Sequence, residues 1–272
     1  MSQPITERAD WLDAANAATR FFSNRDYNGE RLEDRVVFYL QLAADCGLLA
    51  PGKRLLDLGA GICWFDPLAA KLGADVILAD DFGGGGGVTQ ADRSDALEML
   101  DRYRREFGIE IVEQDILRDP LPLPDSSIDG VTCFHSLEHW HHSPKALFAE
   151  IRRVLRPGGW LILATPNAAN LRKRLHVILG ANIWSGLEEW YHDAPVFRGH
   201  VREPIVRDLR QLCEWNGFRV TTTLGRNFIG RDSHALAWIP QRLRHGLVVA
   251  TQSVLRFFPT LCSDIHVVAQ KQ

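Results

Sequence analysis

Between residues 54 and 164, short apolar runs alternate with longer amphipathic stretches, and this alternation constrains the fold of the 272-residue chain most strongly. Such runs predict buried strands, and the stretches between them predict helices with one apolar face. Repeated strand–helix–strand units form a parallel sheet that is covered by helices. The sequence therefore predicts an α/β fold with a seven-stranded, mostly parallel sheet and helices on both faces. The predicted strands span residues 54–58, 75–79, 109–113, 128–134, 160–164, 218–224 and 265–269.

Composition argues against several classes of protein. The chain has a formal net charge of -3 and so lacks the excess of basic residues typical of proteins that bind a phosphate backbone. We therefore expect no nucleic-acid partner. The five cysteines are scattered and odd in number, which indicates reduced thiols in the cytoplasm. Residues 1–10 are polar, and no apolar run reaches about 18 residues, so neither a secretion signal nor a membrane-spanning helix is predicted. We expect a cytoplasmic globular protein.

A turn with two glycines follows the first predicted strand, in the segment Leu55 to Gly61. Because Gly59 and Gly61 lack side chains, the backbone can approach a ligand closely at the start of the next helix. Dinucleotide binding would need a third small residue where Trp64 stands, and Asp57 would repel a pyrophosphate. A cationic nucleotide-like ligand fits better, and S-adenosylmethionine carries a sulfonium and an ammonium group.

Acidic residues follow the next two strands as well. Asp80 lies roughly twenty residues after the glycine turn, where a carboxylate can accept both hydroxyls of a ribose. Asp115 follows the third strand and can accept from an exocyclic amine while Ile116 packs on the ring. A single acid at a strand end is usually solvated surface. Three acids after three successive strands, with Asp57 as the first, predict a shared site.

Several segments resemble, in order, the motifs of class I S-adenosylmethionine-dependent methyltransferases. The segments from Ser136 to His139 and from Arg153 to Gly159 are similar to the small-molecule branch, which includes ubiquinone-biosynthesis and sugar methyltransferases. The resemblance implies a Rossmann-like fold and S-adenosylmethionine as cofactor. The matching segments are Leu55 to Gly61, Val76 to Asp80, Gln114-Asp115, Ile128 to His139 and Val154 to Asn167.

The resemblance also assigns roles to individual residues. It implies that Asp57, Gly59 and Gly61 hold the methionine end of the cofactor and that Asp80 holds the ribose. It further implies that the adenine is held by Asp115 and Ile116. The sequence departs from the family at Cys63, where glycine is frequent, and in the glycine run 83–87.

Histidines gather after the fourth strand, where they can serve the transfer reaction. A methyl group on a sulfonium is already activated, so the protein must chiefly align the acceptor and exclude water. A hydroxyl acceptor must lose a proton, which a histidine can take. We predict His139 and His135 as catalytic residues and His135 also as a cofactor contact. For each, a surface or structural histidine is an equally open interpretation, and His200 and Tyr191 are weaker candidates.

The segment from His135 to His139 also matches a metal-binding pattern. If a helical turn begins at residue 135, His135, Glu138 and His139 share one face. Ubiquinone-type relatives have a Glu-x-x-Glu-His version that binds magnesium, but a histidine in the first position suits a hard cation poorly. A zinc-protease motif is rejected because the segment lies at a strand end in a cofactor domain. No metal is predicted.

The sequence thus predicts an S-adenosylmethionine-dependent methyltransferase acting on an oxygen of a small molecule, namely a glycan, a phenol or a lipid-linked intermediate. A methyltransferase acting on protein or nucleic acid is second, because Phe134 to Leu137 replaces the Asn/Asp-Pro-Pro-aromatic motif of enzymes that methylate DNA bases. A catalytically silent cofactor-binding subunit and a dehydrogenase are the remaining alternatives.

The predicted domain organisation is one decorated domain. Residues 1–48 are predicted as an N-terminal helical lid, with helices at 7–22 and 30–46, and residues 49–272 as the methyltransferase domain. Insertions at 165–202 and 225–262 are expected to form a cap that binds the acceptor. The amphipathic element from Pro240 to Phe258 is expected to pack on the sheet edge or on a partner subunit in a homodimer. Peripheral contact with a membrane is its alternative role.

Overall fold

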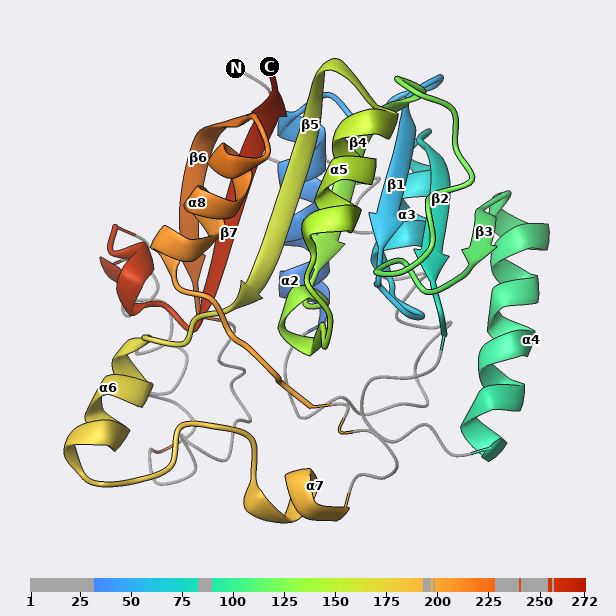
Figure 1. The fold of residues 1–272 in the computed structure, drawn as a ribbon. Coiled ribbons are helices and arrows are strands. Elements are labelled where there is room, and N and C mark those ends of the chain that lie inside the picture. The colour runs from blue at the N-terminus through green and yellow to red at the C-terminus, as the bar shows by residue number, and fades with distance from the viewer. Residues whose placement is uncertain are drawn as a thin grey trace.

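The computed structural model describes residues 32–82, 90–192, 197, 199–227, 240, 254–255 and 257–272. Its strands are β1 (Arg54–Leu58), β2 (Asp75–Asp80), β3 (Glu110–Glu113), β4 (Ile128–Phe134), β5 (Leu155–Pro166), β6 (Phe218–Arg226) and β7 (Asp264–Lys271). They form one sheet with the order β3-β2-β1-β4-β5-β7-β6 (Figure 1). Neighbouring strands pair in parallel, except that β7 is antiparallel to both β5 and β6. The predicted seven-stranded, mostly parallel sheet is confirmed.

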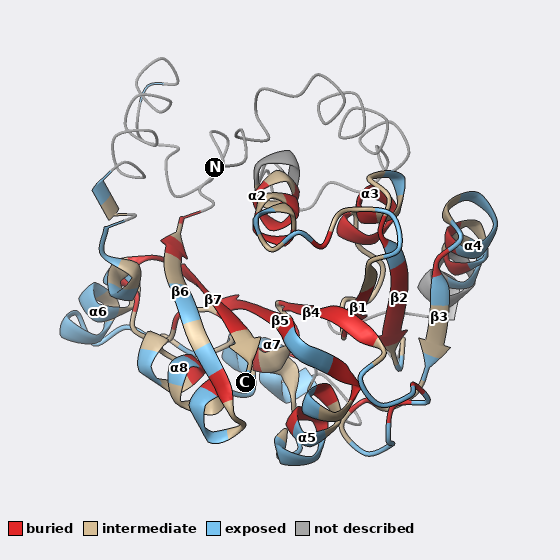
Figure 2. Cartoon of the chain, turned by 90° about the horizontal axis from the view of Figure 1, so that it is seen from above, coloured by how far each residue is buried: buried red, intermediate tan, exposed pale blue. Residues whose placement is uncertain are grey.

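Helices cover both faces of the sheet (Figure 2). On one face lie α2 (Leu32–Asp45), α3 (Phe65–Lys71) and α4 (Gln90–Phe107), and on the other lie α5 (Lys145–Val154) and α8 (Val206–Trp215). Successive residues of a strand face opposite sides, so Leu55 packs in the core with α2 and α3 while Leu56 packs in the core with α5. The central strands are therefore apolar on both faces, as a doubly covered sheet requires.

The helix predicted at 30–46 is α2. Val36, Leu40 and Ala43, which share one face of this helix, are all buried. That face packs in the core on the sheet, so α2 belongs to the layer that covers it. The other predicted helix of the lid, at 7–22, lies outside the described residues, and the lid stays a prediction.

Two short helices, α6 (Leu171–Ile178) and α7 (Leu187–His192), occupy the predicted insertion 165–202. They lie beyond the carboxyl ends of the parallel strands (Figure 1). Neither helix has a buried residue, so neither contributes to the core. The two helices lie at the edge of the sheet where open α/β folds bind ligands. A cap over an acceptor would have to lie at this edge.

Two further predictions fall on parts of the chain that are not described. The glycine run 83–87 lies outside the described residues, and so does most of the element from Pro240 to Phe258. Within the described ranges, no helix has both the length and the apolar character needed to cross a membrane. All five cysteines are free thiols.

Candidate active site

The chain turns tightly after β1. Gly59 and Gly61 have positive φ angles of 67° and 59°, a region that residues with a Cβ atom rarely adopt. The N–H of Gly59 donates to the carbonyl of Ala79, 2.8 Å away in β2. A Cβ atom at Gly59 would lie 2.0 Å from the Oγ of Ser136, whereas one at Gly61 would meet no atom of the described residues within 4 Å. The turn is therefore crowded at Gly59 and open at Gly61, so a ligand can approach the backbone beside Gly61 and be held in a cradle formed by the turn.

Residues after two other strands meet at this turn. Ser136 follows β4 and is 6% exposed, and Ile116 follows β3 and is 7% exposed. The Cδ1 of Ile116 would lie 3.4 Å from a Cβ atom at Gly59. The loops after β1, β3 and β4 thus converge at one edge of the sheet, which brings the predicted residues Gly59 and Ile116 together.

Asp80 is held by the same turn. Its Oδ2 accepts from the N–H of Gly61 at 2.8 Å, and its Oδ1 accepts from the N–H of Phe82 at 2.7 Å. Burial raises the pKa of Asp80 to about 6, although both backbone donors favour the ionised form. Each carboxylate oxygen has a second lone pair that can accept a hydroxyl. The orientation of Asp80 therefore fits the predicted contact with a ribose.

Asp115 lies beside Ile116, but its carboxylate is engaged within its own turn. Oδ1 accepts from the N–H of Leu117 at 3.0 Å, and Oδ2 lies 3.4 Å from the Nε of Arg118. The carbonyl of Asp115 also accepts from the N–H groups of Arg118 and Asp119. The carboxylate caps a tight turn and positions Ile116, while its contact with an adenine amine stays a prediction.

Asp57 is completely buried on the face that α2 and α3 cover. Its Oδ1 accepts from the Oγ1 of Thr132 in β4 at 2.8 Å, and its Oδ2 has no hydrogen-bond partner in the described part of the chain. Burial raises the pKa of Asp57, and the neighbouring carboxyl of Asp66 raises it further. The acid before the glycine turn is thus a buried carboxyl with one unused oxygen, which a cation would stabilise.

His135, directly after β4, has a positive φ of 52°. Its Nδ1 lies 3.3 Å from the Oε1 of Glu138, and its Nε2 lies 3.4 Å from the Oδ1 of Asp264 in β7. Burial raises the pKa of Glu138, but the hydrogen bond and charge of His135 outweigh it and leave that pKa lowered. Both nitrogens of His135 face buried carboxylates, so His135 links β4 to β7. Its catalytic and cofactor-binding roles stay predictions.

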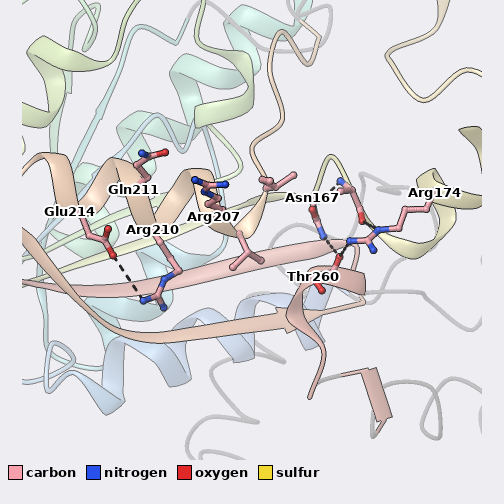
Figure 3. Close-up of a pocket in the computed structure, with 10 residues that line it drawn as sticks. Asn167, Arg174, Arg207, Arg210, Gln211, Glu214 and Thr260 are labelled. Carbon is pink, nitrogen blue, oxygen red and sulfur yellow. Dashed lines mark hydrogen bonds and ion pairs between the residues drawn. The ribbon is translucent and has the colours of Figure 1, made fainter.

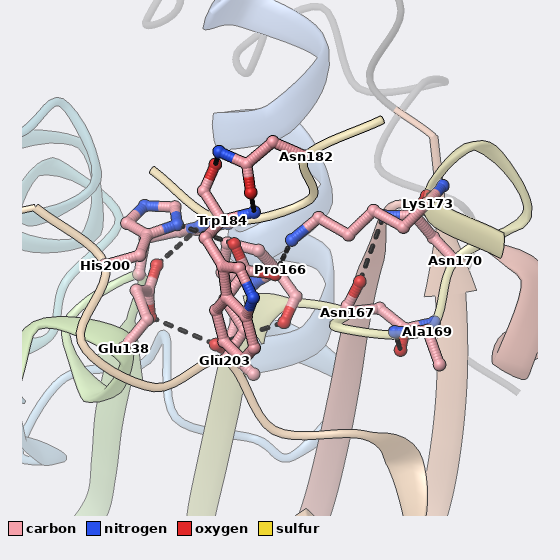
Figure 4. A network of polar contacts seen from close by, with 12 residues as sticks. Glu138, Pro166, Asn167, Ala169, Asn170, Lys173, Asn182, Trp184, His200 and Glu203 are labelled. Carbon is pink, nitrogen blue, oxygen red and sulfur yellow. Dashed lines mark hydrogen bonds and ion pairs between the residues drawn. The ribbon is translucent and has the colours of Figure 1, made fainter. Parts of the chain in front are cut away.

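His139 lies on a 3₁₀ turn, η2 (Leu137–His139), and its ring is 4.9 Å from that of His200. The Nδ1 of His139 is 3.2 Å from the carbonyl oxygen of Gly199. The Nδ1 of His200 is 2.8 Å from the Oε1 of Glu203, and Glu203 also pairs with Lys173 (Figure 4). The hydrogen bond to Glu203 raises the pKa of His200. Carbonyl and carboxylate oxygens only accept, so each Nδ1 carries the proton and, in a neutral ring, each Nε2 is the basic nitrogen.

The segment that carries Gly199 and His200 is fastened over the end of β4. The N–H groups of Val201 and Arg202 donate to the carbonyl of Glu138 at 2.8 and 3.1 Å. The Oε2 of Glu138 accepts from the Oγ1 of Thr165 in β5 at 3.0 Å. Glu138 therefore joins the ends of β4 and β5 to the segment that crosses them.

Two groups of side chains have the composition of a metal site. In the described ranges, Glu138, His139 and His200 bring one ligand atom each within 4.8 Å of one another. Asp57, Cys63 and Asp66 do the same, also without an ion. The first group differs from the predicted face of 135, 138 and 139, because His200 takes the place of His135. The absence of a metal stays a prediction.

A family model described as "Methyltransferase domain" matches residues 25–223. The chain belongs to this methyltransferase family. It is 30% identical over 190 residues to a probable S-adenosylmethionine-dependent methyltransferase of Mycolicibacterium smegmatis, a match that covers 70% of this chain and 59% of that one. It is also 32% identical over 132 residues to a ubiquinone biosynthesis O-methyltransferase of Burkholderia thailandensis, covering 48% of this chain and 51% of that one.

The chain spans about half the length of the curated relatives it matches. Its fold is similar to the crystal structure of an S-adenosylmethionine-dependent methyltransferase from Archaeoglobus fulgidus, with a TM-score of 0.52 and 18% identity. That alignment covers 87% of this chain and 94% of that one. The predicted membership in the class I S-adenosylmethionine-dependent methyltransferases is confirmed.

Three acids that lie beside candidate site residues were not predicted from the sequence. Asp66 faces Asp57, Asp264 faces His135, and Glu203 faces His200. Asp66 could have been noticed as an acid inside the apolar start of a helix, and Glu203 as an acid three residues after a histidine. Asp264 had no such signal, because it meets His135 only through the antiparallel pairing of β7 with β5.

Other candidate residues of the methyltransferase are placed away from the glycine turn. Tyr191 is 72% exposed on α7. The Nε2 of His141 is 2.5 Å from the carbonyl oxygen of Phe197, and the Nε2 of His142 is 3.1 Å from the Nε of Arg118. These contacts give His141 and His142 structural partners at the surface.

A pocket of about 510 Å³ lies along α8 (Figure 3). Arg174, Arg207 and Arg210 are among the residues that line it, together with Asn167 and Thr260. Arg174 donates to the carbonyl of Thr260, and Arg210 lies 4.0 Å from Glu214. None of the predicted site residues lines this pocket, so it is not the predicted cofactor site.

Replacing Asp80 tests the cofactor site of the methyltransferase directly. We expect Asp80→Ala to weaken S-adenosylmethionine binding by roughly 30-fold, because it removes the acceptor for the ribose hydroxyls and the partner of the Gly61 N–H. Isothermal titration calorimetry measures the change. Asp75→Asn, which removes an exposed carboxylate at the opposite end of β2, serves as the control. Equal affinity of Asp80→Ala and the wild type would remove Asp80 from the site.

Proposed function

We propose that this chain binds S-adenosylmethionine and transfers its methyl group to an oxygen of a small molecule, such as a phenol, a glycan or a lipid-linked intermediate. Three features support binding of S-adenosylmethionine: the open space beside Gly61, the oriented carboxylate of Asp80 and the unpartnered oxygen of Asp57. Transfer of the methyl group to an oxygen atom is supported by the ubiquinone O-methyltransferase relatives.

The observation that carries the transfer chemistry is the hydrogen bond between the Nδ1 of His139 and the carbonyl of Gly199. Because that carbonyl only accepts, the Nε2 of neutral His139 has the lone pair that a general base needs. His139 follows Ser136, which contacts the glycine turn, so the base lies on the loop that adjoins the cofactor cradle.

In the proposed reaction, Asp57, Asp80 and the turn Gly59–Gly61 would hold S-adenosylmethionine, which would supply an activated methyl group and leave as S-adenosylhomocysteine. The Nε2 of His139 takes the proton of the acceptor hydroxyl, whose oxygen receives the methyl group. The remaining tasks, alignment and exclusion of water, are assigned to the segment over β4 and to the predicted cap.

The direct test is turnover. Purified protein is incubated with S-adenosylmethionine and a panel of phenols, catechols, sugars and prenylated quinols, and S-adenosylhomocysteine is quantified. Methyl transfer to an oxygen of one class supports the proposal. Cofactor binding without turnover of any small molecule, combined with turnover of a protein or nucleic-acid substrate, would replace it.

His139→Gln is expected to lower kcat by about 100-fold and to leave the dissociation constant of S-adenosylmethionine within about twofold, because a base acts on the acceptor and not on the cofactor. His141→Gln is the matched control, since His141 has a carbonyl partner on the same segment but lies outside the proposed base position. A fully active His139→Gln enzyme would rule His139 out as the base.

A further inference from the structure

We propose that Asp66 is an additional residue of the cofactor site, and that it shares with Asp57 a proton that leaves when the cationic methionine end of S-adenosylmethionine binds. This inference rests on the cofactor proposed above. The family resemblance implies a role for Asp57 only, and Asp66 comes from the structure alone.

The geometry places two buried carboxyls beside the glycine turn. Asp66 is the second residue of α3 and, like Asp57, is completely buried. Asp57, Asp66 and the thiol of Cys63 bring one ligand atom each within 4.8 Å of one another. The Oδ2 of Asp66 accepts from the Sγ of Cys63 at 3.2 Å. The remaining oxygens, Oδ2 of Asp57 and Oδ1 of Asp66, have no hydrogen-bond partner among the residues that the structure describes.

Two unused buried carboxyl oxygens at one place need a proton or a cation between them. Removing such atoms from water is unfavourable when they find no partner. A shared proton meets this need before the cofactor binds. The turn Gly59–Gly61 connects Asp57 to Cys63 and leaves open space beside Gly61, so a cation held by this turn lies next to the pair.

The groups that face Asp66 do not neutralise it. They are Asp57 from β1, Cys63 from the turn and Tyr103 from α4, whose hydroxyl donates to the carbonyl of Cys63. None of these facing groups, taken from the part of the chain that the structure describes, is a cation. The pair therefore lacks an internal counter-ion, and the ligand is the charge that complements it.

The titration of the pair follows from its burial. Burial raises the pKa of Asp66 to about 7, and burial together with the charge of Asp66 raises the pKa of Asp57. A bound cation favours the ionised carboxylates and so lowers both pKa values in the complex. Binding then releases a proton, and the affinity rises as the pH increases through about 7 and falls as the pH decreases.

The test counts protons by calorimetry. S-adenosylmethionine is titrated into the full chain at about pH 7.5 in phosphate, HEPES and Tris, whose ionisation enthalpies differ. We expect release of about one proton per cofactor bound. Asp80, whose pKa is about 6, is already ionised at that pH and contributes little. For Asp66→Asn we expect less proton release than for the wild type and an affinity that depends less on pH, because the carboxyl of Asp66 no longer raises the pKa of Asp57.

The control is Asp75→Asn, which removes an exposed carboxylate at the opposite end of β2 and should keep the wild-type proton count. Binding by the wild type without proton release, or equal release by Asp66→Asn and the wild type, would overturn the inference. If Asp66→Asn does not fold, the number of protons that the wild type releases per cofactor bound still tests the inference. Absence of any cofactor binding by the wild type is a different result, because it overturns the proposed cofactor and this inference with it.

Discussion

Gly59→Ala is expected to abolish measurable S-adenosylmethionine binding and to lower the free energy of unfolding by about 3 kcal/mol. The new Cβ atom would lie 2.0 Å from the Oγ and 2.9 Å from the Cβ of Ser136, at a φ of 67°. Relieving this contact separates the loops after β1 and β4, which together form the cofactor cradle. Urea unfolding and calorimetry measure the two effects.

Two variants separate the crowding from the backbone strain. Gly47→Ala has a similar φ of 70° with no atom within 4 Å, so it measures the cost of the backbone conformation alone, about 1 kcal/mol. Gly59→Ala combined with Ser136→Gly removes the crowding atoms and should recover part of the lost stability. A Gly59→Ala protein as stable as Gly47→Ala, with normal cofactor affinity, would contradict the assignment.

Glu138→Ala is expected to lower the free energy of unfolding by about 3 kcal/mol. Glu138 is completely buried, accepts from Thr165 at 3.0 Å and faces His135 at 3.3 Å. Removing it leaves a cavity, an unpaired hydroxyl and a histidine that has lost one of two carboxylates. Urea denaturation checks the prediction, with Glu106→Ala, a half-exposed glutamate of a helical ion pair, as the control.

Glu138→Gln isolates the charge in this buried cluster. Glutamine keeps the size of the side chain and the bond from Thr165, so we expect a loss of only about 1 kcal/mol near neutral pH. Since the pKa of Glu138 is lowered in the fold, its charge stabilises the protein above the ordinary glutamate pKa, and this contribution is lost as the pH falls through the lowered value. The difference in unfolding free energy between the wild type and Glu138→Gln should therefore stay constant down to the ordinary glutamate pKa, about 4.5, and narrow as the pH falls below it. A difference that does not narrow below that pH would show that the charge is not responsible.

The cofactor side of the site was largely predictable from local sequence. Gly59, Gly61 and Asp80 lie within or directly after two strands whose apolar pattern is unambiguous, and parallel pairing of β1 with β2 brings their ends together. The same reasoning placed Ile116 correctly beside the turn. It could not tell that the carboxylate of Asp115 is engaged by Leu117 and Arg118, because a short side chain in a turn has several nearby partners.

The catalytic side was much less predictable. His135 and His139 are close in sequence and equivalent as residue types, yet both ring nitrogens of His135 face buried carboxylates, whereas the Nδ1 of His139 faces a backbone carbonyl. Their partners Asp264 and Gly199 come from β7 and from the segment over β4. No periodicity within residues 135–139 contains that information.

The amino-acid sequence by itself determined the order of strands and helices, the positive-φ turn and the row of acids at the strand ends. These features depend on short-range patterns of apolar residues, glycine and charge, and parallel pairing then follows from the alternation of strands and helices. Only the tertiary structure decided which oxygens are buried without a partner, which histidine nitrogen is basic, and that Asp57 has Asp66 as its neighbour. Burial and hydrogen-bond partners depend on contacts between distant segments, so the charge state of this site is a property of the folded chain.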